Sequence, residues 1–390
     1  MPRNNNFENL EKYFRSGFSY DEILLFLQQF DGVDISKRSL HRKLRERGLF
    51  RRKNHSAIND VLSVTHNQLQ GSGSNFGYRL MHHKLQSLHI NTDRETVRHC
   101  LTILDPIGVL RRRNHRFRRR RYLSRGPNFT WHLEGYDKLK PYEFVIHGAM
   151  DGWSRKVLWL YVGSSNNDPR ITGYLFVRTI NELNLLPRIV LTDRGSENVV
   201  IAGCQRFFRR EHLDSNSGYN SFRYGPSTRN QKIESWWSVF RKNRTDWWIS
   251  FFKYLCDAGS YDPSVPIQVE CCRFCFTGIL QTELDETLKL WNTHYVRRTR
   301  NSECPPGRPD VLFYAPDESN GTDYKFDVTR RDIETANNFV TQLPIFSCLD
   351  SSLQLFQRIM SERNLEYPSD VKSAESLFIN LIAEINTRRL

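Results

Sequence analysis

The chain has 390 residues, of which 38% are hydrophobic and 13% aromatic, so it can form a packed core and is not wholly disordered. Its 57 Lys and Arg residues exceed its 43 Asp and Glu residues, and the net charge of +14 favours a polyanionic partner. No run of roughly 18 apolar residues is present, and MPRNNNFENL lacks the apolar segment of a secretory signal, so we expect neither a membrane span nor secretion.

Residues 18–52 predict two short helices that are separated by a tight turn. Apolar residues recur at helical spacing before Gly32, at Ile23, Phe26, Leu27 and Phe30. Ser36 is a suitable N-cap for a second, basic helix that ends at Gly48. Such a pair is typical of a helix-turn-helix, and we expect residues 1–54 to bind DNA. The side chains expected to reach a groove are Arg38, His41 and Arg42. The alternative is a helical hairpin whose basic face is only solvated.

A second helical DNA-binding unit is predicted over residues 55–126. It contains a linker at 71–77 (GSGSNFG), a helix at 77–86, and a helix that Thr92 or Asp93 caps and DPIG ends. Nine arginines then lie between residues 111 and 125. Because such a run repels itself, its natural partner is phosphate, although a solvated charge run or a nuclear-import signal is the alternative. The expected phosphate contacts are Arg111, Arg112, Arg113, Arg118, Arg119, Arg120 and Arg121.

Residues 127–304 change to an α/β pattern. Strands are predicted at 129–134, 143–150, 156–162, 188–192 and 221–225, with helices after the third, fourth and fifth strands. This order predicts a mixed five-stranded sheet flanked by helices, as in the ribonuclease-H-like fold. A long amphipathic helix is predicted over 269–298. It is followed at 305–390 by a mostly helical C-terminal region in which we find no chemical motif.

Three acids occupy positions that suit a metal-dependent site. Glu134 lies at the end of the first predicted strand, Asp193 ends the fourth, and Glu234 lies on a helix after the fifth. Carboxylates so placed can hold two Mg²⁺ ions, which stabilise the attacking and leaving oxygens of a displacement at phosphorus. Spacing alone does not separate this arrangement from three solvated carboxylates.

The segments around these acids resemble the integrase core domain of retroviral integrases and DDE-type transposases. They read TWHLEGYDKLKPYEF, RIVLTDRGSEN and YGPSTRNQKIESWW. Within the family they are most similar to the integrase-core proteins of eukaryotic mobile elements, which carry the motif HxDGYDKLKP. The resemblance covers about residues 90–300. It implies two Mg²⁺ or Mn²⁺ ions, double-stranded DNA as the partner, a homo-oligomer, and phosphodiester cleavage followed by strand transfer in DNA integration. Because DNA is the expected partner, we also expect a nuclear location.

The resemblance assigns roles to individual residues. Asp193 and Glu234 match the second and third metal-binding acids, and Glu134 stands where the family has aspartate. Asn230, one helical turn before Glu234, is expected to contact the DNA substrate. Asp151, Ser154 and Arg155 match turn positions that we interpret as structural. No counterpart of the zinc site of retroviral integrases is present, so no zinc is predicted.

Glu134 makes the predicted activity uncertain. Glutamate is one methylene longer than aspartate, and Mg²⁺ requires near-octahedral geometry at about 2.1 Å, so we expect a reduced rate. Asp137 is three residues away and is expected to point to the other face of the strand. Three hypotheses follow: a DNA recombinase of reduced activity, a catalytically inactive DNA-binding protein derived from a transposase, and a protein-interaction scaffold.

Overall fold

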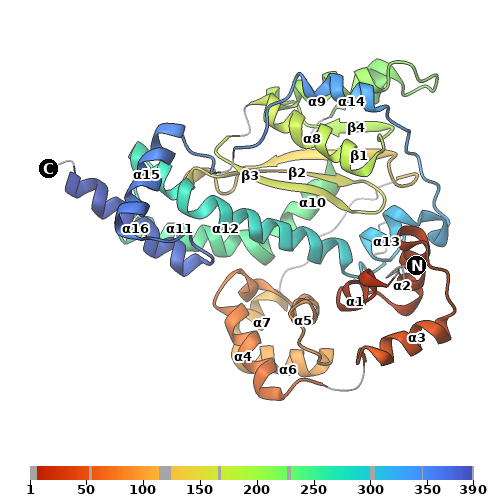
Figure 1. Cartoon of the computed structure of the whole chain (residues 1–390), viewed down its shortest axis with the longest axis horizontal. Coiled ribbons are helices and arrows are strands. Elements are labelled where there is room, and N and C mark those ends of the chain that lie inside the picture. The colour runs from red at the N-terminus through yellow and green to blue at the C-terminus, as the bar shows by residue number, and fades with distance from the viewer. Residues whose placement is uncertain are drawn as a thin grey trace, which may run out of the picture.

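A five-stranded mixed sheet forms the centre of the protein (Figure 1). The structure is a computed structural model that describes residues 7–51, 55–113, 124–165, 168–225, 230–298, 304–344 and 346–388. The strands are β1 (Thr130–Tyr136), β2 (Val145–Asp151), β3 (Val157–Gly163), β4 (Ile189–Thr192) and β5 (Phe222–Tyr224). Their order is β3-β2-β1-β4-β5, with β1 antiparallel to β2 and parallel to β4. The predicted α/β fold class, a ribonuclease-H-like integrase core, is confirmed.

Helices cover both faces of the sheet because side chains alternate along each strand. Leu133 faces the hydrophobic cluster under α8 (Pro169–Leu183) and α9 (Val199–Phe208). Tyr136 faces the opposite cluster and stacks on Trp237 with ring centroids 4.8 Å apart. The helices of this second face are α10 (Gln231–Phe240), α11 (Asp246–Asp257) and α12 (Pro266–Thr293), and a π-helical turn (Arg241–Thr245) joins α10 to α11.

The C-terminal region completes the core. Its helices are α13 (Pro309–Tyr314), α14 (Arg330–Asn337), α15 (Asp350–Arg363) and α16 (Val371–Arg388). Phe356 of α15 and Phe378 of α16 are fully buried in the same cluster as Phe276 of α12. The hydrophobic core is therefore continuous across residue 304, where we predicted a domain boundary.

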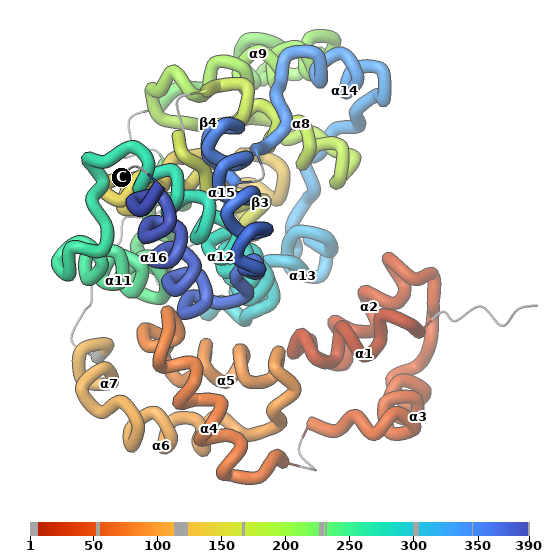
Figure 2. The backbone as a smooth tube through the Cα atoms, turned by 60° about the vertical axis from the view of Figure 1, so that its left-hand side comes forward, coloured from red at the N-terminus to blue at the C-terminus, as the bar shows by residue number. Residues whose placement is uncertain are grey.

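The N-terminal region contains two helical units with separate hydrophobic clusters (Figure 2). The first unit has α1 (Glu8–Arg15), α2 (Tyr20–Asp31) and α3 (Lys37–Glu46). Ser19 and Glu22 form a capping box on α2, and the Ser36 hydroxyl accepts the Ser39 N–H at 3.2 Å at the start of α3. Both helices predicted around Gly32 are thus present, and α1 packs against them.

The second unit differs from the sequence prediction at two places. It contains α4 (Ile58–Leu69), α5 (Tyr78–Ser87), α6 (Arg94–Leu104) and α7 (Pro106–Arg113). The predicted linker is a buried 3₁₀ turn (Ser72–Asn75), because Phe76 packs into the unit's core beside it. Asp93 caps α6 and DPIG ends it, as predicted, but Pro106 then begins α7, which was not predicted, since proline is well suited to the first helical position.

No helix within the described residues is long and apolar enough to cross a lipid bilayer.

The close approach at Gly73 gives a test of the 3₁₀ turn. A Cβ at this position would lie 2.5 Å from the Gln68 carbonyl oxygen, which is backbone and cannot turn aside. We expect Gly73→Ala to lower the free energy of unfolding by about 1–3 kcal/mol in a denaturant titration. A Cβ at Gly71 meets no atom within 4 Å, so Gly71→Ala is the control and should change it by less than about 0.5 kcal/mol. Equal stabilities of the two variants would contradict this packing.

Candidate active site

Parallel pairing brings two of the predicted acids to one end of the sheet. The β1–β4 register ends at Leu133 opposite Thr192, and Glu134 and Asp193 are the next residue of each segment. Because side chains alternate, Glu134 lies on the face opposite Leu133, which α10 covers. Glu234 lies in the first turn of α10. The structure therefore directs all three acids to one region.

The pKa of Glu134 indicates that other carboxylates lie near it. Burial raises the pKa of Glu134 to about 8, and repulsion from Glu234 and Asp193 adds to the rise. Burial also raises the pKa of Asp193. Glu134 Oε2 and Asp193 Oδ1 are buried without a hydrogen-bond partner among the described residues. Buried carboxylate oxygens without hydrogen-bond partners repel one another, and they are good ligands for a cation.

Two further acids lie beside Asp193. Asp137 raises the pKa of both Asp193 and Glu197 through its charge, although burial is the largest cause for each. Strand alternation does not decide the direction of Asp137, because β1 ends at Tyr136 and Asp137 lies in the turn that follows. Glu197 was not predicted. Its signal was the acid four residues after Asp193 in TDRGSEN.

The three carboxylates are chemically suited to bind a hard divalent cation, but they do not lie close enough together to form a metal site. Carboxylate oxygens are the ligands that Mg²⁺ and Mn²⁺ prefer, and Glu134, Asp193 and Glu234 are the residues that would supply them. Within the described part of the chain, no three His, Cys, Asp or Glu side chains are close enough to hold a metal ion. The donor chemistry fits the implied ions, while the spacing is wider than that of a formed site.

Asn230 positions α10 instead of reaching solvent. It is 1% exposed, and its Oδ1 lies 2.8 Å from His132 Nδ1 while its Nδ2 donates to the Leu133 carbonyl at 2.9 Å. Its amide thus bridges the helix that carries Glu234 to the strand that carries Glu134. The predicted DNA contact by Asn230 is not supported, because both ends of the amide are used inside the protein.

The turn after β2 is structural, as predicted. Asp151 is fully buried and accepts hydrogen bonds from the Asn128 N–H at 2.8 Å, the Ser154 N–H at 2.8 Å and the Ser154 hydroxyl at 2.7 Å. Burial still raises its pKa to about 6. Arg155 is also buried, and its guanidinium donates to the Pro305 carbonyl. This turn supports the sheet from the side away from the acids.

The predicted recognition residues of α3 are on its surface. Arg38, His41 and Arg42 are exposed, whereas Leu40 and Leu44 are buried against α1 and α2. His41 packs against Tyr20 with ring centroids 4.2 Å apart. The exposed face is suited to contact a polyanion, and DNA contact by these three residues remains a prediction.

Of the predicted arginine run, the described residues Arg111 and Arg112 have contacts inside the fold. Arg111 donates to Asn75 Oδ1 at 2.9 Å, and Arg112 donates to the Ser74 carbonyl at 2.8 Å and to Asp105 Oδ2 at 2.9 Å. These two side chains fasten α7 to the 3₁₀ turn, so their charges are partly used within the fold. Arg113 is the last residue of α7. The remaining predicted phosphate contacts lie outside the described residues, namely Arg118, Arg119, Arg120 and Arg121.

The bridging role of Asn230 predicts a loss of stability on truncation. Asn230→Ala removes the buried hydrogen bonds with His132 and the Leu133 carbonyl, and we expect the free energy of unfolding to fall by about 1–3 kcal/mol. Asn220 is exposed and donates only a long bond to the Ser215 carbonyl, so Asn220→Ala is the control. If Asn230→Ala is as stable as this control, the amide does not hold α10 to β1.

The raised pKa of Glu134 predicts a pH-dependent stability. Its pKa is about 8 in the folded protein against an ordinary 4.5, so the folded state retains a proton that the unfolded state loses. In metal-free buffer, the free energy of unfolding should therefore fall as pH rises from about 4.5 to about 8. Glu134→Gln has no such proton, so its stability advantage over the unsubstituted protein should grow across this window. Parallel curves for the two proteins would rule out the raised pKa.

Comparison with known proteins agrees with this geometry. Residues 122–307 match the family model described as integrase core domain. The matched region contains the whole sheet, the three acids and α12. No curated protein matches the chain. Over residues 122–307 the chain is therefore similar to integrase core domains.

Proposed function

We propose that this protein is an integrase- or transposase-like polynucleotidyl transferase that binds double-stranded DNA and has reduced activity. The observation that carries the proposal is the convergence of Glu134, Asp193 and Glu234, with a buried, unpaired oxygen on each of the first two. The similarity of this region to integrase core domains supports it.

The reaction is displacement at phosphorus. A water oxygen attacks a phosphodiester, a P–O bond forms, and the bond to the 3′ oxygen breaks to give a free 3′-hydroxyl. That hydroxyl then attacks a second phosphodiester. A new P–O bond joins the two DNA segments, and the bond to the 3′ oxygen of the attacked phosphodiester breaks and releases another 3′-hydroxyl. Divalent cations, when bound, supply charge stabilisation for the attacking and leaving oxygens. Glu134, Asp193 and Glu234 supply oxygen ligands, and Asn230 keeps α10 against β1.

The identity of residue 134 limits this reaction. Its carboxylate has a pKa of about 8, so in the absence of a cation most of it is protonated at neutral pH. That proton would have to leave before the Glu134 oxygen could serve as a cation ligand. The longer side chain must also fold back to meet the octahedral geometry that Mg²⁺ requires. Both effects lower the rate, and Mn²⁺ should be the better activator.

A catalytically inactive DNA-binding protein derived from a transposase is the second candidate. The observation that favours it is the spacing of the acids, which do not form a metal-binding group within the described ranges. Under this hypothesis the exposed basic face of α3 retains its role in DNA binding after the loss of cleavage.

The proposed partners and location follow from the same reasoning. Joining two DNA ends requires more than one active site, which supports a homo-oligomer. The excess of 57 basic over 43 acidic residues and the exposed Arg38, His41 and Arg42 support DNA as the partner. Eight cysteines without a disulfide support a reducing compartment, for which we propose the nucleus.

Nicking of supercoiled plasmid in Mg²⁺ and in Mn²⁺ tests the proposal. We expect the unsubstituted protein to nick slowly, Glu134→Asp to nick faster, and Asp193→Asn to lose on the order of 100-fold or more in rate. Asp257→Asn, on the exposed end of α11, is the control and should nick at the unsubstituted rate. Activity of Glu134→Asp alone would favour the inactive DNA-binding protein. Nicking that survives Asp193→Asn would remove this site from the mechanism.

A further inference from the structure

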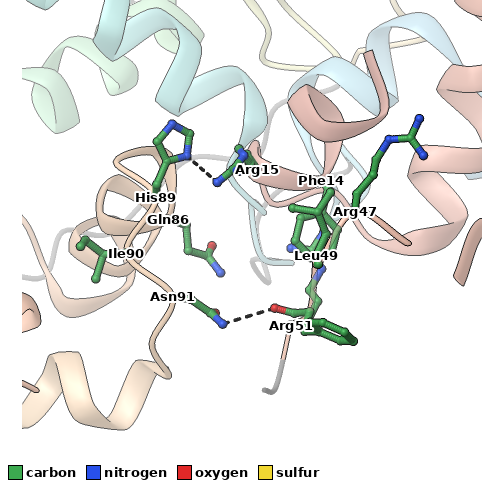
Figure 3. A pocket seen from close by; sticks show the side chains of 11 residues that line it. Phe14, Arg15, Arg47, Leu49, Arg51, Gln86, His89, Ile90 and Asn91 are labelled. Carbon is green, nitrogen blue, oxygen red and sulfur yellow. Dashed lines mark hydrogen bonds between the residues drawn. The ribbon is translucent and has the colours of Figure 1, made fainter. Parts of the chain in front are cut away.

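A cavity of about 200 Å³ lies where the two N-terminal helical units meet (Figure 3). The first unit supplies residues at the ends of α1 and α3, and the second supplies the end of α5 and the segment after it. Asn91 Nδ2 donates to the Phe50 carbonyl at 3.3 Å across the junction. Ligand pockets for drug-sized molecules are larger, at about 300–1,000 Å³, so this cavity suits a group the size of phosphate.

The lining of the cavity is basic. Arg15, Arg51 and His89 contribute to it, and Arg47 lies at its rim with its side chain turned away (Figure 3). None of the described lining residues is acidic. The cavity therefore has a concentration of positive charge without a carboxylate among its own walls.

Arg51 is a partly buried cation that is hydrogen-bonded to Tyr20 and attracted by the charge of Glu22. Its guanidinium packs over the Phe14 ring at 4.1 Å and donates to the Phe18 carbonyl, and burial lowers its pKa. No described carboxylate forms an ion pair with it. Buried guanidinium groups elsewhere do have such partners: Arg308 lies 2.8 Å from Glu22, and Arg112 lies 2.9 Å from Asp105. A partly buried cation with no carboxylate at ion-pair distance can still take an anion.

Arg15 and His89 add two oriented donors. Arg15 Nη1 lies 2.7 Å from His89 Nδ1, and since arginine can only donate, His89 Nδ1 accepts and its Nε2 carries the proton. His89 has φ 65°, a conformation that glycine adopts more easily.

These cations are not required to cap the helices that end here. A helix C-terminus attracts positive charge through its free carbonyls. At this junction the local backbone already bonds them: Gly17 N–H donates to Phe14, Leu49 N–H to Leu44, and Ile90 N–H to Leu85. The only capping bond from a lining guanidinium is the 3.4 Å contact of Arg47 with the Lys43 carbonyl. Apart from the Arg15–Glu11 pair and the charge of Glu22 that acts on Arg51, the positive charge of the cavity is thus not used at the helix ends.

We propose that this cavity binds a phosphate group, and that the group belongs to the backbone of duplex DNA. Arg51 and Arg15 would hold its oxygens, with His89 Nε2–H as a further donor. A phosphate held between the units fixes their orientation on the duplex, which is what backbone contacts do in protein–DNA interfaces. The choice of DNA as the source rests on the proposed function, whereas the phosphate chemistry rests on the cavity itself.

The test uses the full chain and variants that should preserve the fold. Gln86→Glu keeps the shape of the side chain and places a carboxylate among the cavity's cations. His89→Gly removes a hydrogen-bond donor and relieves the strain of the positive φ at this position. Arg330→Gln is the matched control, because Arg330 is an exposed arginine paired with a glutamate on its own helix, as Arg15 is with Glu11. Duplex affinity is measured by fluorescence anisotropy over a range of salt concentrations, and inorganic phosphate binding by calorimetry. Thermal unfolding verifies that each variant is folded.

We expect Gln86→Glu to weaken duplex binding about tenfold and to make the slope of log affinity against log salt concentration shallower by about 1. His89→Gly should act in the same direction, and Arg330→Gln should not. Saturable binding of inorganic phosphate that Gln86→Glu abolishes, with duplex affinity unchanged, would support the cavity and assign it to a free phosphate. Unchanged affinity for both ligands in folded variants would overturn the proposal. Because no cleavage is measured, failure of the catalytic hypothesis leaves this result unaffected.

Discussion

The parallel pairing of β1 with β4 is the constraint on which the candidate active site depends. It places Glu134 and Asp193 directly after the registered residues Leu133 and Thr192 of neighbouring strands. Asn230 then fixes α10 over β1 through His132 and the Leu133 carbonyl, which brings Glu234 to the same region. A shift of one residue in this register would turn Glu134 to the other face of the sheet.

The result is a negatively charged region within a strongly basic protein. The pKa of Glu134 rises to about 8 because burial and two neighbouring carboxylates disfavour its ionised form. Such repulsion lowers the stability of the cation-free protein and is relieved when a divalent cation binds. The proposed function would use these acids for cation-dependent chemistry, although the described acids are spaced more widely than in a formed metal site and the extra methylene of Glu134 makes them less suited to Mg²⁺.

The second helical unit and the core are joined by buried charged contacts. Arg244 of the π-helical turn after α10 lies 3.7 Å from Glu283 of α12 and donates to the Ser72 hydroxyl of the second unit. Lys84 of α5 pairs with Glu286 of α12. The helix that carries Glu234 thus continues into a contact with the second unit, so the proposed DNA-binding and cleavage functions would share one framework.

The amino-acid sequence by itself determined the local elements and the chemical types of the site. Periodicity and caps located the strands and α2, α3, α5 and α6, and short motifs identified Glu134, Asp193 and Glu234. Tertiary structure alone decided that Asn230 is buried, that Asp137 lies near Asp193, that Arg111 and Arg112 fasten α7, and that α15 and α16 complete the core. Capping and periodicity act between residues close in the chain, whereas burial and charge coupling depend on which distant segments meet.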